Sequence, residues 1–133
     1  MRAKTWTGAL AIAAMVAVAA AAVVTRAGAR GDVREIHLVA RGMAFFLAGD
    51  NTAPNPTIRV RAGERVRLIV SNETAGIEHD LAVASLGIAT DPLATGAIGA
   101  LDLQAPGEPG AHEYACRPHA VMMRGRLIVE AGR

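Results

Sequence analysis

The sequence predicts an all-β fold, a Greek-key sandwich of seven to eight short strands preceded by an N-terminal signal or anchor helix. In residues 33–130, apolar and polar residues alternate over short runs, which is the pattern of a strand with one buried face. Clusters rich in Gly, Pro and Asn separate these runs, as turns do. No apolar repeat of helical period lies between them, so the pattern indicates a sandwich or a barrel.

The N-terminus has the organisation of an export signal. Arg2 and Lys4 precede an uncharged, mostly apolar run, Gly8–Val24, and the small residues Ala27-Gly28-Ala29 follow it. This order predicts a signal peptide over residues 1–29, cleaved after Ala29. The apolar run is close to the shortest length that spans a bilayer, so an uncleaved membrane anchor is the alternative. Residues 30–133 then form one exported domain of about a hundred residues, in the periplasm or another extracytoplasmic space.

The charge balance of the chain depends on this leader. The whole sequence has 14 Lys+Arg and 12 Asp+Glu, a net charge of +2. Arg2, Lys4 and Arg26 would leave with the leader, so 11 basic and 12 acidic residues would remain, a net charge of −1. A basic surface for nucleic acid is therefore not expected.

The first half of the domain predicts four strands, at residues 33–40, 43–48, 57–61 and 65–71. A loop over residues 49–56 follows from its turn chemistry. The third and fourth strands flank Ala62-Gly63-Glu64, which predicts a hairpin with one buried face. Its other face carries four arginines and is expected to be solvated: Arg59, Arg61, Arg65 and Arg67.

The second half predicts four further strands around one stretch without a clear pattern. A loop over residues 72–78 leads into His79, and a strand follows at 81–84. Residues 85–99 are rich in Gly, Ala and Thr and give no assignment. A turn is expected over residues 106–110. Strands are expected at residues 100–105, 111–116 and 125–130.

The connection between the last two predicted strands concentrates soft metal donors. It contains Cys116, His119, Met122 and Met123, and a thiolate, an imidazole and a thioether together suit copper. An odd cysteine in an exported chain indicates an intermolecular bridge or a reactive or liganding thiol. His79, at the entry to a separate strand, supplies a second imidazole, because loops at one end of a Greek key converge. A donor set without Asp or Glu suits copper better than calcium or magnesium.

Two motifs in this connection resemble those of small blue-copper proteins. Cys116-Arg-Pro-His119 matches a Cys-x-Pro-His motif, and Met123-Arg-Gly125 before an apolar strand is similar to a Met-x-Gly motif. Residues 33–130 thus resemble a cupredoxin of the plastocyanin/azurin family, with an amicyanin-like copper loop. The resemblance implies that His79, Cys116 and His119 form a trigonal plane around one copper ion, Cu(I) or Cu(II), with a methionine as the weak axial ligand.

The choice of the axial methionine depends on whether the spacing from His119 or the register of the last strand is taken as the reference. Met122 reproduces the amicyanin spacing when counted from His119. Met123 reproduces Met-x-Gly and keeps the last strand in register, and a one-residue shift would turn that strand inside out. We therefore choose Met123. Asp80 stands where the family usually has an Asn that braces the cysteine loop, so we expect this brace to differ.

Other residues capable of binding a metal have plainer interpretations. His37 falls among the outward residues of its strand, and His112 lies at the far end of the strand that leads to Cys116. Met43 is expected to fill the core, and Tyr114 is expected to be a core aromatic residue. None of these four is predicted to be a ligand.

The leading functional hypothesis is a one-electron carrier, an exported type 1 copper protein that exchanges electrons with unidentified redox protein partners. The family resemblance implies transfer through the solvent-facing edge of His119. The alternative is a periplasmic copper chaperone or storage protein. An enzyme is not expected, because the motif has no acid–base pair and four histidines are too few for a second copper centre. A metal-free interaction domain is the remaining alternative, and a monomer is the default assembly.

Overall fold

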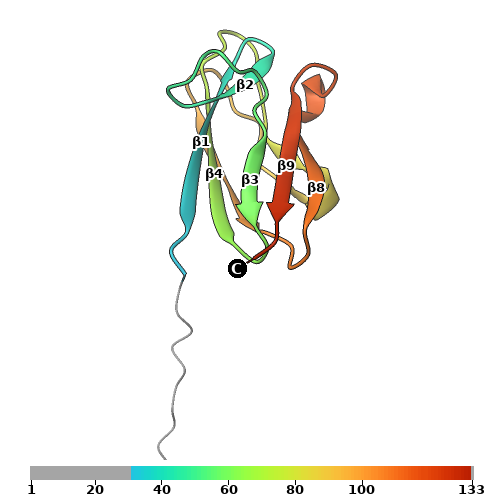
Figure 1. The fold of residues 1–133 in the computed structure, drawn as a ribbon. Coiled ribbons are helices and arrows are strands. Elements are labelled where there is room, and N and C mark those ends of the chain that lie inside the picture. The colour runs from blue at the N-terminus through green and yellow to red at the C-terminus, as the bar shows by residue number, and fades with distance from the viewer. Residues whose placement is uncertain (1–30, 133) are drawn as a thin grey trace, which may run out of the picture. The chain divides into compact units, whose positions relative to one another are not determined.

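The structure, a computed structural model, describes residues 31–132, which form two β-sheets packed on each other (Figure 1). The predicted leader over residues 1–29 lies outside the described residues. Within the described range the strands are β1 Arg34–Arg41, β2 Ala44–Leu47, β3 Ile58–Arg61, β4 Arg65–Asn72, β5 Ala82–Val83, β6 Ile88–Ala89, β7 Ile98–Gln104, β8 Gly110–Ala115 and β9 Arg124–Glu130. The all-β prediction is confirmed.

The described range contains nine strands, one more than the largest number predicted from the sequence. The addition is β6, which pairs with β5 and lies in the stretch that gave no assignment. A strand of two residues is too short to show alternation, so its sequence carries no signal of it. Besides the strands, two 3-10 turns occur in residues 31–132, Ala84–Leu86 and Arg117–His119. This range contains no helix with the length and hydropathy that a bilayer span requires.

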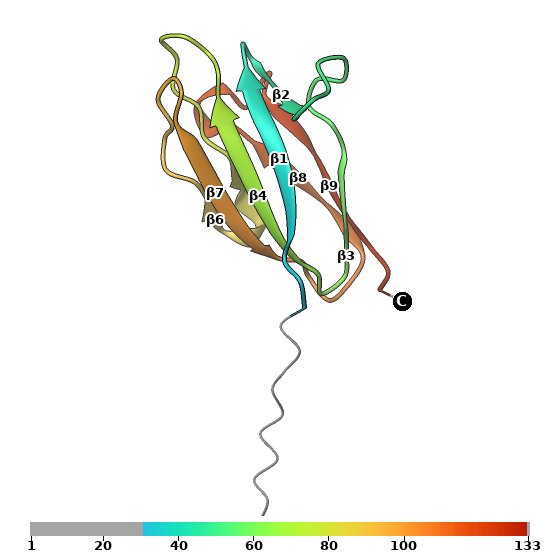
Figure 2. The same cartoon turned by 90° about the vertical axis from the view of Figure 1, so that its left-hand side faces the viewer.

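The first sheet has the strand order β2-β1-β4-β7. β1 pairs antiparallel with β2 and parallel with β4, and β4 pairs antiparallel with β7. Figure 2 shows β7, β4 and β1 side by side in front of the other sheet. The parallel pair joins two segments that are not consecutive in the chain.

The second sheet has the order β3-β9-β8-β5-β6 and carries the candidate site at one end. β9 lies between β3, to which it is parallel, and β8, to which it is antiparallel. β8 ends at Ala115 and β9 begins at Arg124, so these two central strands hold both ends of the connection that contains Cys116 and His119.

The hairpin predicted for residues 57–71 is wrong, although both of its strands exist. β3 pairs with β9 in one sheet, and β4 pairs with β1 and β7 in the other. The turn at Ala62–Glu64 therefore crosses between the sheets. Both strands bury alternate residues, Ile58 and Val60 in β3 and Val66 and Leu68 in β4. Alternation shows which face is buried but not which strand is the neighbour, so the two arrangements look identical in sequence.

The core lies between the two sheets and includes the alternate buried residues of β3 and β4 described above. The largest fully buried side chains include Tyr114, Phe45, Leu38, Leu68, Leu81 and Met123. The four strand arginines are exposed, as predicted. Ion pairs neutralise two of them: Arg59 with Glu130 and Arg67 with Asp102.

Candidate metal centre

Three side chains from two strand junctions meet at one end of the second sheet. His79 precedes β5 and is held by a bridge to Leu93, whereas Cys116 follows β8 directly. His119 ends the 3-10 turn Arg117–His119, drawn at the upper right of Figure 1. One potential donor atom from each of the three lies within 4.8 Å of the other two. In residues 31–132 this is the one such group of His, Cys, Asp or Glu.

Both imidazoles turn the same ring nitrogen toward the sulfur. Cys116 Sγ is 3.7 Å from His79 Nδ1 and 3.4 Å from His119 Nδ1. The two rings meet edge to face, with centroids 5.0 Å apart. The other nitrogen of His79, Nε2, contacts Thr74 Oγ1 at 3.1 Å, which fixes the orientation of that ring.

The surroundings of His79 favour its neutral imidazole. Burial lowers the pKa of His79, and the positive charge of a protonated His119 lowers that pKa further. Burial raises the pKa of the Cys116 thiol. A metal ion that binds here would therefore have to displace the thiol proton, as thiolate-binding metals do.

Backbone hydrogen bonds close the chain around Cys116 into a loop. Cys116 N donates to Met123 O at 2.9 Å, and His119 N donates to Cys116 O at 3.1 Å. Pro118 fits the start of the 3-10 turn because its φ is preset and it has no N–H to satisfy. These bonds make the connection from Cys116 to Met123 a compact loop whose first and last residues are neighbours.

The two methionines of this loop have opposite environments. Met123 is fully buried, whereas Met122 is 55% exposed. Met123 shares strand parity with the buried residues Gly125, Leu127 and Val129 of β9, so the register of this strand turns Met123 inward. This burial favours Met123 over Met122 as the methionine available to the site.

The four residues that are not predicted to be ligands have the following environments. The His37 side chain is 54% exposed on β1. His112 hydrogen-bonds through Nδ1 to Ser85 Oγ at 2.8 Å. Met43 packs against the core, and Tyr114 is fully buried.

Two supporting asparagines were not predicted from the sequence. Asn72 is fully buried, donates to the Ile77 and Leu93 carbonyls and accepts from Thr74 N, so it shapes the loop before His79. Asn55 donates to Met122 O at 2.9 Å and accepts from Phe45 N at 3.0 Å. The contacts of Asn72 with Leu93 and of Asn55 with Met122 join residues 21 and 67 positions apart, so no local pattern reveals them.

Asp80 braces the cysteine loop through its carboxylate. The Asp80 carboxylate accepts hydrogen bonds from the backbone N–H and from Nε of Arg117, both at 2.7 Å. The opposite charges of residues next to His79 and Cys116 are the one sequence signal that could have indicated this pair.

The donor chemistry of the site fits copper. Two imidazole nitrogens and one sulfur converge, with a thioether buried at the end of the same loop and no carboxylate among the donors. Trigonal His₂Cys sites with a weak axial Met are typical of electron-transfer copper centres. Calcium and magnesium prefer oxygen ligands and do not suit this set.

Solved structures with the same fold include copper proteins. Auracyanin A, a "blue" copper protein from Chloroflexus aurantiacus, is 17% identical with a TM-score of 0.59, over 74% of this chain and 100% of that one. A dithionite-reduced auracyanin from Roseiflexus castenholzii is 16% identical with a TM-score of 0.58, over 75% and 99%. The copper-containing nitrite reductase from Thermus scotoductus is 19% identical with a TM-score of 0.59, over 77% of this chain but 28% of the reductase.

No known protein-family model and no curated protein sequence matches the chain. These structural matches are all below 25% identity, so they show the fold and leave the chemistry to the residues themselves. Two facing sheets, a copper-type donor cluster at one end and these matches together show that the chain has the cupredoxin fold of the small blue copper proteins.

Proposed function

We propose that this protein is an exported type 1 copper protein that carries single electrons between redox proteins. The proposal depends on the meeting of His79, Cys116 and His119, whose donor atoms lie within 4.8 Å of one another. Met123 is proposed as the axial ligand, supported by its burial. A copper ion bound there would supply a couple between Cu(II) and Cu(I) that takes up and releases one electron.

The chain's own contribution is to hold these donors in place and keep water away from them. His79 is 1% exposed and Cys116 is fully buried. His119 is partly exposed, so it is the donor of the three that reaches the surface. Electrons are proposed to enter and leave through its outer edge, beside Val121 and Met122, which are 89% and 55% exposed.

The proposal assigns no substrate to this chain. The structural matches include a reductase, but this chain spans 28% of its length, so that enzyme's activity does not transfer to it. In residues 31–132 the donor cluster described above is the one group of its kind, which supports a single copper ion.

Export is part of the proposal and is supported by two features. Residues 1–29 combine a basic start, an apolar run and a small-residue cleavage site. The lone cysteine is fully buried in the site, where a bound metal would protect it in an oxidising compartment. The protein is proposed to act as a monomer in the periplasm or another extracytoplasmic space, with membrane attachment only if the leader is retained.

The test is the colour of the copper-loaded protein. Thiolate-to-copper charge transfer should give an intense visible band, and Cys116→Ser should abolish it. His79→Asn should also remove the band, whereas the matched change His37→Asn on exposed β1 should leave it intact. A copper-loaded wild type without this band would contradict the proposal.

A second measurement separates a carrier from a copper chaperone or store. A carrier should pass repeatedly between its oxidised and reduced forms while keeping its copper. Rapid transfer of Cu(I) to a competing chelator under the same conditions would favour the chaperone. The burial of His79 and Cys116 supports the carrier, because chaperones need an open route for the metal.

A further inference from the structure

One acidic and one basic residue connect the two halves of the candidate centre. Asp80 follows His79, and Arg117 follows Cys116. The Asp80 carboxylate accepts from Arg117 N through Oδ1 and from Arg117 Nε through Oδ2, each at 2.7 Å. Arg117 Nη2 also donates to Thr90 O at 3.3 Å. One carboxylate therefore fixes both the backbone and the side chain of the residue next to the cysteine.

Asp80 also contacts the sulfur itself. Its backbone N–H points at Cys116 Sγ, with the nitrogen 3.5 Å from the sulfur. Asp80, the residue after His79, thus contacts the Cys116 sulfur through its backbone N–H. Its carboxylate holds Arg117, the residue after Cys116. The position of the sulfur relative to His79 depends on this link between the two strand junctions.

The ion pair is strongly asymmetric in exposure. The Asp80 side chain is 4% exposed and that of Arg117 is 57% exposed. A buried carboxylate is unfavourable unless it is paired and hydrogen-bonded. The planar guanidinium satisfies one carboxylate oxygen while the backbone N–H satisfies the other, and a lysine does not reproduce this fixed geometry. The pair therefore has a buried negative end, on the residue whose backbone N–H faces the sulfur, and an exposed positive end.

We propose that Asp80 and Arg117 are positioning residues for the copper centre, which hold the Cys116 sulfur in place and whose opposite charges set the reduction potential. The inference depends on the function proposed above. In the chain without metal, the same pair keeps the thiol inaccessible.

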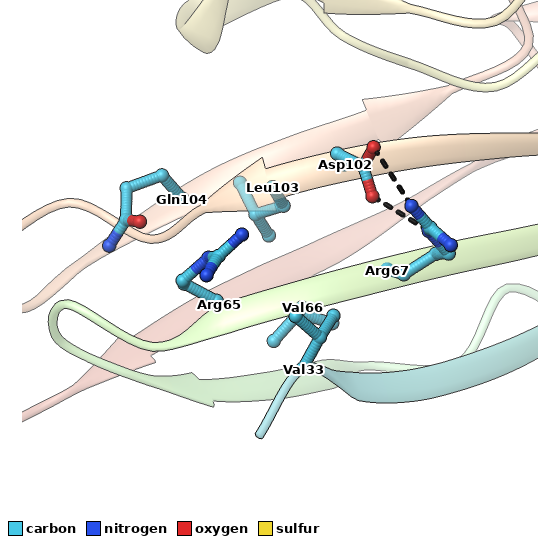
Figure 3. A pocket seen from close by; sticks show the side chains of 7 residues that line it. All are labelled: Val33, Arg65, Val66, Arg67, Asp102, Leu103 and Gln104. Atoms are coloured by element: carbon cyan, nitrogen blue, oxygen red, sulfur yellow. Dashed lines mark hydrogen bonds and ion pairs between the residues drawn. The ribbon is translucent and has the colours of Figure 1, made fainter. Parts of the chain in front are cut away.

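The chain offers a matched control pair far from the cysteine loop. Arg67 on β4 donates to Asp102 on β7 through Nε at 2.8 Å and through Nη2 at 3.3 Å (Figure 3). This pair has the same chemistry but links two strands of the first sheet, and its side chains are 45% and 72% exposed. A substitution at Arg67 therefore measures the effect of losing an ion pair of this kind away from the cysteine loop.

The first experiment measures how fast a thiol reagent labels Cys116 in the metal-free protein. The sulfur is buried, so labelling requires local opening of the loop. Arg117→Gln should accelerate labelling about tenfold or more, while Arg67→Gln should label at the wild-type rate. Arg117→Lys keeps the charge but loses the planar fork, so it should also accelerate labelling. Equal rates in Arg117→Gln and Arg67→Gln would overturn the positioning role.

The second experiment measures the reduction potential of the copper-loaded variants. Arg117→Gln leaves an unpaired negative charge and favours the oxidised ion, so the potential should fall. Asp80→Asn leaves an unpaired positive charge, so the potential should rise. Each change should alter the reduction equilibrium about threefold, or roughly 28 mV for one electron, and the double variant should fall between them. A purely structural role would not give opposite signs, and shifts of the same sign would overturn the electrostatic role.

These two readouts separate the inference from the proposed function. If copper-loaded wild type lacks the charge-transfer band, the proposed function fails, and the labelling rates still decide whether the pair holds the thiol. Asp80→Asn is close in shape to the natural side chain, and circular dichroism would show that each variant keeps the sheet content. Arg117→Lys serves as the folded variant should Arg117→Gln fail to fold.

Discussion

The ring of Tyr114 lies directly over Gly125. The two residues are register partners on β8 and β9. A Cβ atom at position 125 would lie 2.3 Å from both Cζ and the hydroxyl oxygen of Tyr114, closer than real Cβ contacts. The hydroxyl also donates to Pro56 O at 2.6 Å, which leaves the ring little freedom to move. The glycine at the start of the last strand is therefore required by the tyrosine that lies two residues before the cysteine.

Gly125→Ala should destabilise the fold. The methyl group would overpack a closed part of the core, at a cost of about 1–3 kcal/mol in the free energy of unfolding. Denaturant unfolding of the metal-free protein measures this. Gly107→Ala is the matched control, because a methyl group at that position would meet no atom within 4 Å beyond its chain neighbours, and it should change stability by less than about 0.5 kcal/mol. Equal stability of the two variants would contradict the contact.

Met123→Leu should alter the copper centre without unfolding the domain. Leucine nearly conserves the volume of methionine, so the loss of stability should stay below about 1.5 kcal/mol. The thioether is removed, so the charge-transfer spectrum and the reduction potential should both shift. Met122→Leu, at the exposed neighbouring position, should change neither. The reverse outcome would assign the axial role to Met122.

Removing copper should lower the melting temperature. A ligand that binds only the folded state stabilises it by about 2.7 kcal/mol at a hundred times its dissociation constant. For a domain of about a hundred residues, each 1 kcal/mol corresponds to about 4–8 °C. Calorimetry of the loaded and metal-free forms measures the difference. Cys116→Ser should lose most of this gain and His37→Asn should keep it; an equal gain in both would place the metal elsewhere.

Glu64 should make stability depend on pH on the acid side. Its carboxylate accepts from Arg34 Nε at 2.7 Å and from Arg61 N at 2.7 Å, and the hydrogen bond from Arg34 is the main cause of a lowered Glu64 pKa. The stabilisation is present above the ordinary glutamate value of 4.5 and is lost as pH falls through the lower folded-state pKa.

Glu64→Gln should therefore flatten the acid limb of the stability curve. The ion pair is partly exposed, so the difference should be at most about 1 kcal/mol. Unfolding of wild type and variant, compared across that pH range at low salt, measures it. A variant whose acid limb keeps the wild-type slope would show that Glu64 contributes nothing to it.

The fold class and the donors that meet were predictable because both depend on local patterns. Alternation in β4 and β9 identifies their buried faces, and the motif from Cys116 to Met123 carries its chemistry in consecutive residues. The partners of β3 and the second role of Asp80 were not predictable. Both depend on which distant segment of the chain lies next to β3 or next to Asp80. The spacing of residues along the sequence does not show which segment that is. His79 was reachable only through its place at the entry to a strand, the convergence of loops at one end of a Greek key, and the resemblance.

The pairing of β3 with β9 has a consequence for how the domain is made. β9 lies between β3 and β8, so a chain that lacks it leaves β3 unpaired and opens one edge of β8. Contacts between segments this distant form slowly, because a long intervening chain must first be closed into a loop. The domain therefore completes its architecture only once synthesis has passed Glu130, the end of the strand that joins β3 to β8.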